Sequence, residues 1–139
     1  MYLIDTNVIS ELRKGPKANQ GVRAFFEHCI QEHTTLYLSV ITIGELQRGI
    51  GLIRHRGDEK QAHLLETWFN QILDQYQPFI LPINLEIALT WGDFRVPHYQ
   101  NTLDKLIAAT AHQHQLIVVT RNQKDFEGMG VPILNPFTQ

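Results

Sequence analysis

Four acidic residues follow short apolar runs or open a helical pattern: Asp5, Glu45, Asp104 and Asp125. If the apolar runs are parallel strands, these side chains converge outside the carboxyl ends of the sheet, where such sheets bind their ligands. Carboxylates about 4 Å apart repel by about 4 kcal/mol at an effective dielectric constant near 20, so a converging set calls for a cation. Mg²⁺ or Mn²⁺ suits oxygen ligands, activates water and neutralises charge on a phosphoryl oxygen. The joint pattern therefore indicates phosphodiester hydrolysis.

Each acid taken alone also has a structural explanation. Asp5 can cap a short helix expected over 7–13, because Asp accepts a backbone hydrogen bond at that position. Glu45 and Asp125 each stand three residues after a residue that can cap a helix, as in a capping box or a close variant of one. Asp104 falls in the first turn of an expected helix, where the macrodipole favours an acid. A cap is the commoner role for any single acid, and it is the set of four that favours a site.

The elements that must position these acids follow from hydrophobic periodicity. Short apolar runs predict buried strands at Tyr2–Ile4, Leu36–Val40, Phe79–Leu81, Leu116–Val119 and Pro132–Leu134. Apolar residues spaced three and four apart predict helices around 22–30, 43–53, 64–73, 85–94 and 103–114. Strands that alternate with helices imply right-handed crossovers and a mainly parallel sheet with helices on both faces. The predicted fold class is α/β.

Length and composition limit the classes of protein that remain. The 139 residues fit a single domain, 1–139. A net charge of −2, from 12 basic and 14 acidic residues, argues against a general nucleic-acid-binding polycation. Hydrophobic residues make up 43% and charged residues 19%, which supports a folded core and argues against disorder. Cys29 is a single cysteine, so neither an intrachain disulfide nor a zinc ribbon is expected, which suits a reducing compartment.

Several other classes of site lack their motifs. No apolar run approaches the 18–20 residues, roughly, that span a bilayer, and the first residues lack the pattern of a signal peptide, so we expect a cytoplasmic protein with no membrane association. No Walker or dinucleotide glycine motif occurs, so no nucleotide cofactor is expected. His112 and His114 are two residues apart and would point to different faces of a helix, so they do not make a zinc pair.

Four segments carry a family resemblance: LIDTNVISEL at 3–12, SVITIGELQRG at 39–49, DKLIAATA at 104–111 and TRNQKDF at 120–126. In this order they resemble the four motifs of PIN-domain proteins of the VapC toxin type, the ribonuclease half of bacterial type II toxin–antitoxin pairs. A lone Asp-Thr-Asn would be a weak signal. Four motifs in order, spread over nearly the whole chain, are specific.

The resemblance implies a PIN-like three-layer sandwich and an endoribonuclease that depends on Mg²⁺, with Mn²⁺ as a substitute. It implies cleavage of structured RNA, often transfer RNA, by a metal-activated water. Asp5 and Asp104 would bind the metal, and Glu45 and Asp125 would complete the acidic ring as further catalytic residues. The resemblance also implies a homodimer and a cognate antitoxin whose arm lies in the groove and presents an Arg to the acids.

Polar residues beside the acids are further candidates for the pocket: Thr6, Asn7, Thr120 and Asn122. Each could orient water or phosphate, and each could equally cap a turn. Some relatives carry the last acid directly after Thr-Arg, where Asn122 stands, whereas others carry it three residues later, as Asp125 does. The residue that approaches the metal is therefore left open between these two.

Basic residues near the motifs are candidates for RNA contact: Arg13, Lys14, Lys17, Arg48, Lys105, Arg121 and Lys124. Setting the four acids aside leaves 12 basic and 10 acidic residues, which makes contact with RNA at the rim easier. The same residues could simply form a solvated face.

Three alternatives compete with a nuclease. A receiver-like signalling module also binds Mg²⁺ at strand ends, but it needs a phosphorylatable Asp after a central strand, and 79–84 contains none. A phosphatase of the aspartyl-phosphate type needs a second carboxylate two residues after the first, where Asn7 stands. The third alternative is a non-catalytic PIN-like module that binds RNA or a partner, because intact acids are necessary and not sufficient for catalysis.

Overall fold

The computed structural model describes residues 1–138 and contains one parallel sheet with the strand order β3-β2-β1-β4-β5. The strands are β1 Tyr2–Ile4, β2 Leu36–Ser39, β3 Ile80–Leu81, β4 Ile117–Val119 and β5 Ile133–Leu134. Strand β1 is central, because Tyr2 pairs with Leu36 of β2 on one side and with Ile117 of β4 on the other. The chain adds strands first on one side of β1 and then on the other, so the order reverses between β1 and β4. Ligand sites of open α/β sheets lie at such a reversal.

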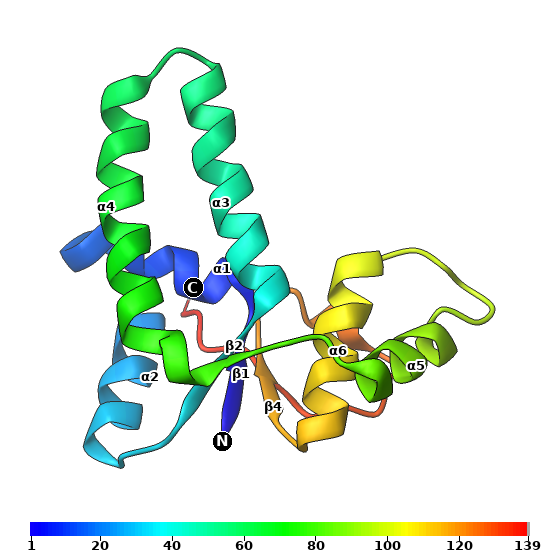
Figure 1. Ribbon diagram of the computed structural model, residues 1–139. Helices are drawn as coiled ribbons and strands as arrows, with labels where there is room; N and C mark the ends of the chain where they lie inside the picture. Colours follow the sequence, from blue (N-terminus) through cyan, green and yellow to red (C-terminus); the bar gives the residue numbers. More distant parts are fainter. Residues whose placement is uncertain (139) are drawn as a thin grey trace.

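Helices cover both faces of the sheet. The α-helices are α1 Thr6–Glu11, α2 Gln20–Gln31, α3 Val40–His55, α4 Glu59–Tyr76, α5 Leu85–Phe94 and α6 Thr102–His114. Short 3₁₀ segments span Leu12–Lys17, Gln77–Phe79 and Gln123–Phe126. In Figure 1, α1 to α4 lie on one side of the strands and α5 and α6 on the other, and α3 and α4 form a long hairpin that projects beyond the sheet.

Alternation along the strands divides the interior into two cores. Ile4 and Val119 are fully buried among residues of α1, α2, α3 and α4, whereas Leu3 and Val118 are fully buried among residues of α6 and the C-terminal segments. Successive side chains of a strand point to opposite faces of the sheet, so neighbouring residues serve different cores. The predicted three-layer α/β architecture is confirmed, and the sheet is parallel throughout the described residues.

The predicted strands and helices are all present, with differences at their ends. Val40, expected in the second strand, begins α3 because the Ser39 hydroxyl accepts a hydrogen bond from the Ile41 amide and caps that helix. Glu45 is therefore not the second half of a capping box, and that interpretation is wrong. Asp5 does cap α1, as one prediction held, because its Oδ1 accepts from the Thr6 amide at 2.8 Å.

The last residues of the described chain pack closely on the start of α2. Asn19 Oδ1 accepts hydrogen bonds from the amides of Gly21 and of Thr138, each at 3.0 Å. A Cβ at Gly21 would overlap the backbone carbonyl of Pro136, so only glycine permits this approach. Within residues 1–138, no helix combines the length and apolar character needed to cross a bilayer.

Replacing Gly21 with Ala should lower the free energy of unfolding by about 1–3 kcal/mol, because the added methyl group forces the C-terminal segment away from α2. Gly51→Ala is the matched control: Gly51 lies within α3, and a Cβ there meets no atom within 4 Å. That substitution should raise stability by about 0.5–1 kcal/mol through helix propensity. Urea denaturation of the two variants measures both effects, and equal behaviour of the variants would contradict the steric argument.

Candidate active site

The carboxylate of Asp5 lies at the reversal between β1 and β4 and is held by three donors. The residue is 3% exposed. Its Oδ1 accepts from the Thr6 amide at 2.8 Å, and its Oδ2 accepts from Thr120 Oγ1 at 2.8 Å and from Asn7 Nδ2 at 3.2 Å. A buried carboxylate is costly unless hydrogen-bonded, and these donors offset part of that cost. The Asp5 side chain therefore has a fixed orientation at the edge of the sheet.

The other polar residues predicted for the pocket join the ends of β1 and β4. Asn7 Oδ1 accepts from the Arg121 amide at 3.1 Å, while its Nδ2 reaches both Asp5 and Thr120 Oγ1. Thr120 is fully buried, and its Oγ1 accepts from the Asn122 amide at 3.0 Å while donating to Asp5. These bonds make the two central strands end in one polar network.

Glu45 reaches the same place from α3. Its Oε1 accepts from Thr6 Oγ1 at 3.0 Å, and the Thr6 amide in turn donates to Asp5. The buried hydroxyl of Thr42 lies 3.4 Å from Thr6 Oγ1 on the same side. Thr6 therefore connects two of the four acids, one through its backbone and one through its side chain.

Asp104 and Asp125 complete the acidic cluster. Burial, the carboxylates of Asp5, Asp125 and Glu45, and a hydrogen bond to Asp125 together raise the pKa of Asp104 to about 7, and burial is the largest cause. Burial also raises the pKa of Asp5, partly offset by the hydrogen bonds from Thr120, Thr6 and Asn7. Asp104 thus lies within electrostatic range of the other three acids.

Asp125, not Asn122, contributes to this cluster. The Asp125 carboxylate acts on both Asp5 and Asp104, whereas the side chain of Asn122 is exposed and makes no capping hydrogen bond. Asn122 contributes only its amide, which donates to Thr120. Of the two candidates that the sequence left open, Asp125, from the 3₁₀ segment after β4, is the one within electrostatic range of Asp5 and Asp104.

The donor set suits a hard divalent cation. All four side chains offer carboxylate oxygens, the ligands that Mg²⁺ and Mn²⁺ prefer. Burial and, secondarily, the neighbouring carboxylates raise the pKa values of Asp104 and Asp5, and a cation would offset the cost of their charged forms. As the side chains stand in residues 1–138, no three acidic, His or Cys groups are close enough to form a finished metal centre. The acids fit such an ion in chemistry and charge.

Lys105 was predicted to contact RNA at the rim, and this is wrong. The residue is 8% exposed, and its Nζ donates to the backbone carbonyl of His98. One step along α6 turns the side chain by about 100° from that of Asp104, toward the interior. Lys105 therefore fastens the loop before α6 and does not face solvent.

The remaining basic candidates are exposed but differ in their contacts. Lys14 Nζ lies 2.9 Å from Glu11 Oε1, and the Arg121 guanidinium stacks over the Phe137 ring at 4.7 Å from its centroid. Among residues 1–138, Arg13 has neither kind of partner, and it lines a pocket beside α1. The rest of the set is exposed as well: Lys17, Arg48 and Lys124.

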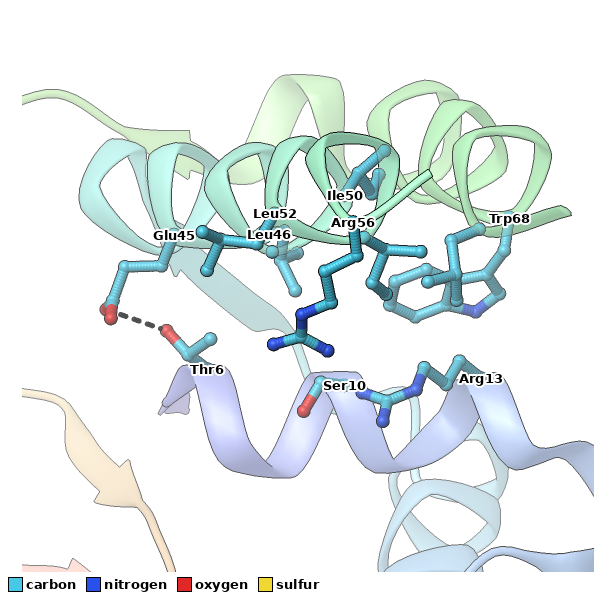
Figure 2. Close-up of a pocket in the computed structure, with 12 residues that line it drawn as sticks. Thr6, Ser10, Arg13, Glu45, Leu46, Ile50, Leu52, Arg56 and Trp68 are labelled. Carbon is cyan, nitrogen blue, oxygen red and sulfur yellow. Dashed lines mark hydrogen bonds between the residues drawn. The ribbon is translucent and has the colours of Figure 1, made fainter. Parts of the chain in front are cut away.

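A pocket of about 330 Å³ opens next to the cluster, between α1 and the α3–α4 hairpin. Thr6 and Glu45 form one end of it, and Figure 2 shows Ser10, Arg13, Arg56 and Trp68 extending away from that end. Sequence reasoning missed Arg56 and Trp68, because neither belongs to a motif and only the packing of the hairpin brings them to α1.

The fold and the acids define an α/β protein with an acidic site at the reversal of its strand order, and the comparisons agree. The model of the PIN domain family matches residues 2–131. Toxin FitB of Neisseria gonorrhoeae is 36% identical, over 99% of each chain. VapC ribonuclease Y4jK of Sinorhizobium fredii is 32% identical, over 99% of this chain and 98% of its own.

A solved structure supports the same assignment. The crystal structure of FitAcB from Neisseria gonorrhoeae superposes with a TM-score of 0.84 at 35% identity, covering 98% of both chains. The chain belongs to the PIN domain family. The resemblance to VapC-type toxins that the four motifs carried is confirmed.

In metal-free protein, Asp104→Asn should raise the free energy of unfolding at pH 8 by about 1–3 kcal/mol, because it removes a carboxylate whose charged form is disfavoured by burial and by three neighbouring acids. The folded-state pKa of Asp104, about 7, exceeds the ordinary value of 3.8, so the folded protein binds a proton there more tightly. Stability of the wild type should therefore fall as pH rises from about 4 to 7, and the gain in the variant should shrink at pH 5.

Urea denaturation in EDTA at pH 5 and pH 8 measures this difference. Asp74→Asn, at an exposed position of α4, controls for the loss of one negative charge and should show no such pH dependence. An Asp104→Asn gain of the same size at both pH values would contradict the crowding of the four acids.

Proposed function

We propose that this protein is a Mg²⁺-dependent endoribonuclease, the toxin of a type II toxin–antitoxin pair, acting on structured RNA such as transfer RNA in the cytoplasm. The observation that carries the proposal is the cluster of four carboxyl groups at the strand reversal, in which the pKa of Asp104 is raised to about 7. The names of two relatives, a toxin and a VapC ribonuclease, support the same function.

Asp5 and Asp104 are the proposed metal ligands, with Glu45 and Asp125 acting directly or through water. Mg²⁺, or Mn²⁺ in its place, would supply positive charge for the phosphate oxygens and a lowered pKa for the attacking water. Thr120, Thr6 and Asn7 keep the Asp5 carboxylate oriented toward this position. A bound cation would favour the ionised form of Asp104, because positive charge lowers the pKa that burial and the neighbouring carboxylates raise.

Glu45 is suited to hold water beside the scissile phosphate. Its Oε1 is fixed by Thr6, and no hydrogen bond from residues 1–138 reaches its Oε2. That second oxygen can accept a hydrogen bond from the attacking water and then its proton. Thr6 would thereby set the position of the proposed base through one hydroxyl group.

The proposed partners are a cognate antitoxin and a second copy of the chain. An antitoxin arginine could pair with the carboxylates in place of the metal and so inhibit cleavage. Leu85 and Leu89 lie one turn apart on α5 and are 71% and 60% exposed, and Tyr99 and Leu103 add exposed apolar surface nearby in sequence. These residues offer an apolar face that would suit the proposed homodimer.

Purified protein incubated with total cellular RNA tests the nuclease. With Mg²⁺ the wild type should yield discrete fragments, whose sequenced ends identify the target, and EDTA should abolish them. Asp104→Asn should reduce the cleavage rate at least about 100-fold, since even residues behind metal ligands contribute about 10–100-fold. Asp74→Asn, prepared identically, should cleave like the wild type.

Equal cleavage by the wild type and Asp104→Asn would indicate a contaminating nuclease and contradict the proposal. RNA that both proteins bind and neither cleaves would instead support the non-catalytic binding module.

A further inference from the structure

Two arginines meet in the pocket beside the acidic cluster. Arg13 lies in the 3₁₀ segment after α1, and Arg56 is the C-cap residue of α3. Figure 2 shows both guanidinium groups directed into the space between α1 and α3, on either side of the Ser10 side chain. Two positive groups that line one pocket make it favourable for an anion to bind there.

No acid of the described chain neutralises these arginines. Among residues 1–138 the ion pairs join Lys14 to Glu11, and Arg54 to Glu59 and Glu66, so Arg13 and Arg56 take part in none. Glu45 is the one acid that lines the pocket in this part of the chain, and its carboxylate is bonded to Thr6 at the far end. Guanidinium forks bind phosphate through paired hydrogen bonds, which makes this end of the pocket suited to a phosphate group.

Part of the pocket lining is apolar and partly aromatic. Trp68 of α4 is half-buried against the core and lines the pocket together with Ile53 and Leu65. An indole face beside a cationic group suits a nucleotide, because bases of single-stranded RNA stack on aromatic side chains while arginines bind the backbone. A bare inorganic anion would leave this wall unused.

The pocket is continuous with the proposed cleavage site. Thr6 and Glu45 belong both to the acidic cluster and to the lining of the pocket. A strand whose scissile phosphate lies at the acids can therefore continue directly between α1 and α3. An acidic peptide would match the two arginines, but neither the continuity with the cluster nor the aromatic wall calls for one.

We propose that this pocket is a nucleotide subsite for the RNA substrate, in which Arg13 and Arg56 bind a phosphate next to the scissile one and Trp68 stacks on a base. Ser10 lines the same pocket, and its hydroxyl donates to the Asn7 carbonyl at 3.5 Å. The proposal rests on the proposed RNA-cleaving function and adds Arg56 and Trp68 to its binding surface.

Tryptophan fluorescence tests the subsite. A single-stranded RNA 12-mer of mixed sequence is titrated into the protein in EDTA, which prevents cleavage. RNA should quench the tryptophan fluorescence of the wild type. The Trp68→Phe variant should show no such quenching, although Trp91 remains on α5. Arg13→Gln combined with Arg56→Gln should raise the Kd at least tenfold and reduce the slope of log K against log salt by about 1, as lost phosphate contacts require.

Lys60→Gln is the matched control for charge. Lys60 is exposed near the start of α4, outside the pocket, and its replacement should change the Kd less than twofold. Circular dichroism and thermal unfolding of every variant confirm that the fold is kept. A loss in Lys60→Gln as large as in the double variant would overturn the subsite in favour of diffuse charge attraction.

Cleavage with Mg²⁺ separates failure of the subsite from failure of the proposed function. If the double variant binds and cleaves RNA as the wild type does, the subsite proposal is overturned and the proposed nuclease function stands. A wild type that neither binds nor cleaves RNA overturns both. A hexaglutamate peptide that binds the wild type more tightly than RNA does, and loses binding in the double variant, assigns the pocket to an acidic peptide instead.

Discussion

The buried carboxylate of Asp5 is the constraint on which the rest of the site depends. An ionised group in the interior needs donors on every side, and these come from Thr6, Asn7 and Thr120. Those donors can surround Asp5 only if β1 and β4 are neighbours and end at the same level. The pairing of β1 with β4 and the polar network at their ends thus together hold a carboxylate at the centre of the sheet.

The fold places further carboxylates near Asp5, and their mutual repulsion lowers the stability of the folded protein. Burial and the carboxylates of Asp5, Asp125 and Glu45 raise the pKa of Asp104 to about 7. Sites that perform chemistry often depart from what stability alone would favour. The departure is confined to one edge of the sheet, because Leu3, Ile4, Val118 and Val119 directly beneath it are fully buried and apolar.

Local patterns account for what the sequence predicts well, and long-range packing accounts for what it misses. Apolar runs and helical spacing indicate the elements, and acids at strand ends indicate the site, because both signals lie within a few residues. Arg56 and Trp68 carry no such signal, since only the α3–α4 hairpin brings them to α1. Lys105 is buried because it lies on the face of α6 that packs against the core. The prediction that it contacts RNA used only its proximity in sequence to the motifs, which does not indicate the face of the helix.

The hydrogen bond from Thr120 to Asp5 joins residues 115 positions apart. Strand β1 lies at residues 2–4, yet its partner β4 comes only at 117–119, so the centre of the sheet closes after most of the chain is available. Contacts of such sequence separation form late, because a long loop must be ordered first. A chain still being synthesised holds Asp5 and Glu45 without Asp104, Thr120 or Asp125. The order of synthesis itself thus delays assembly of the acidic site until the protein is nearly complete.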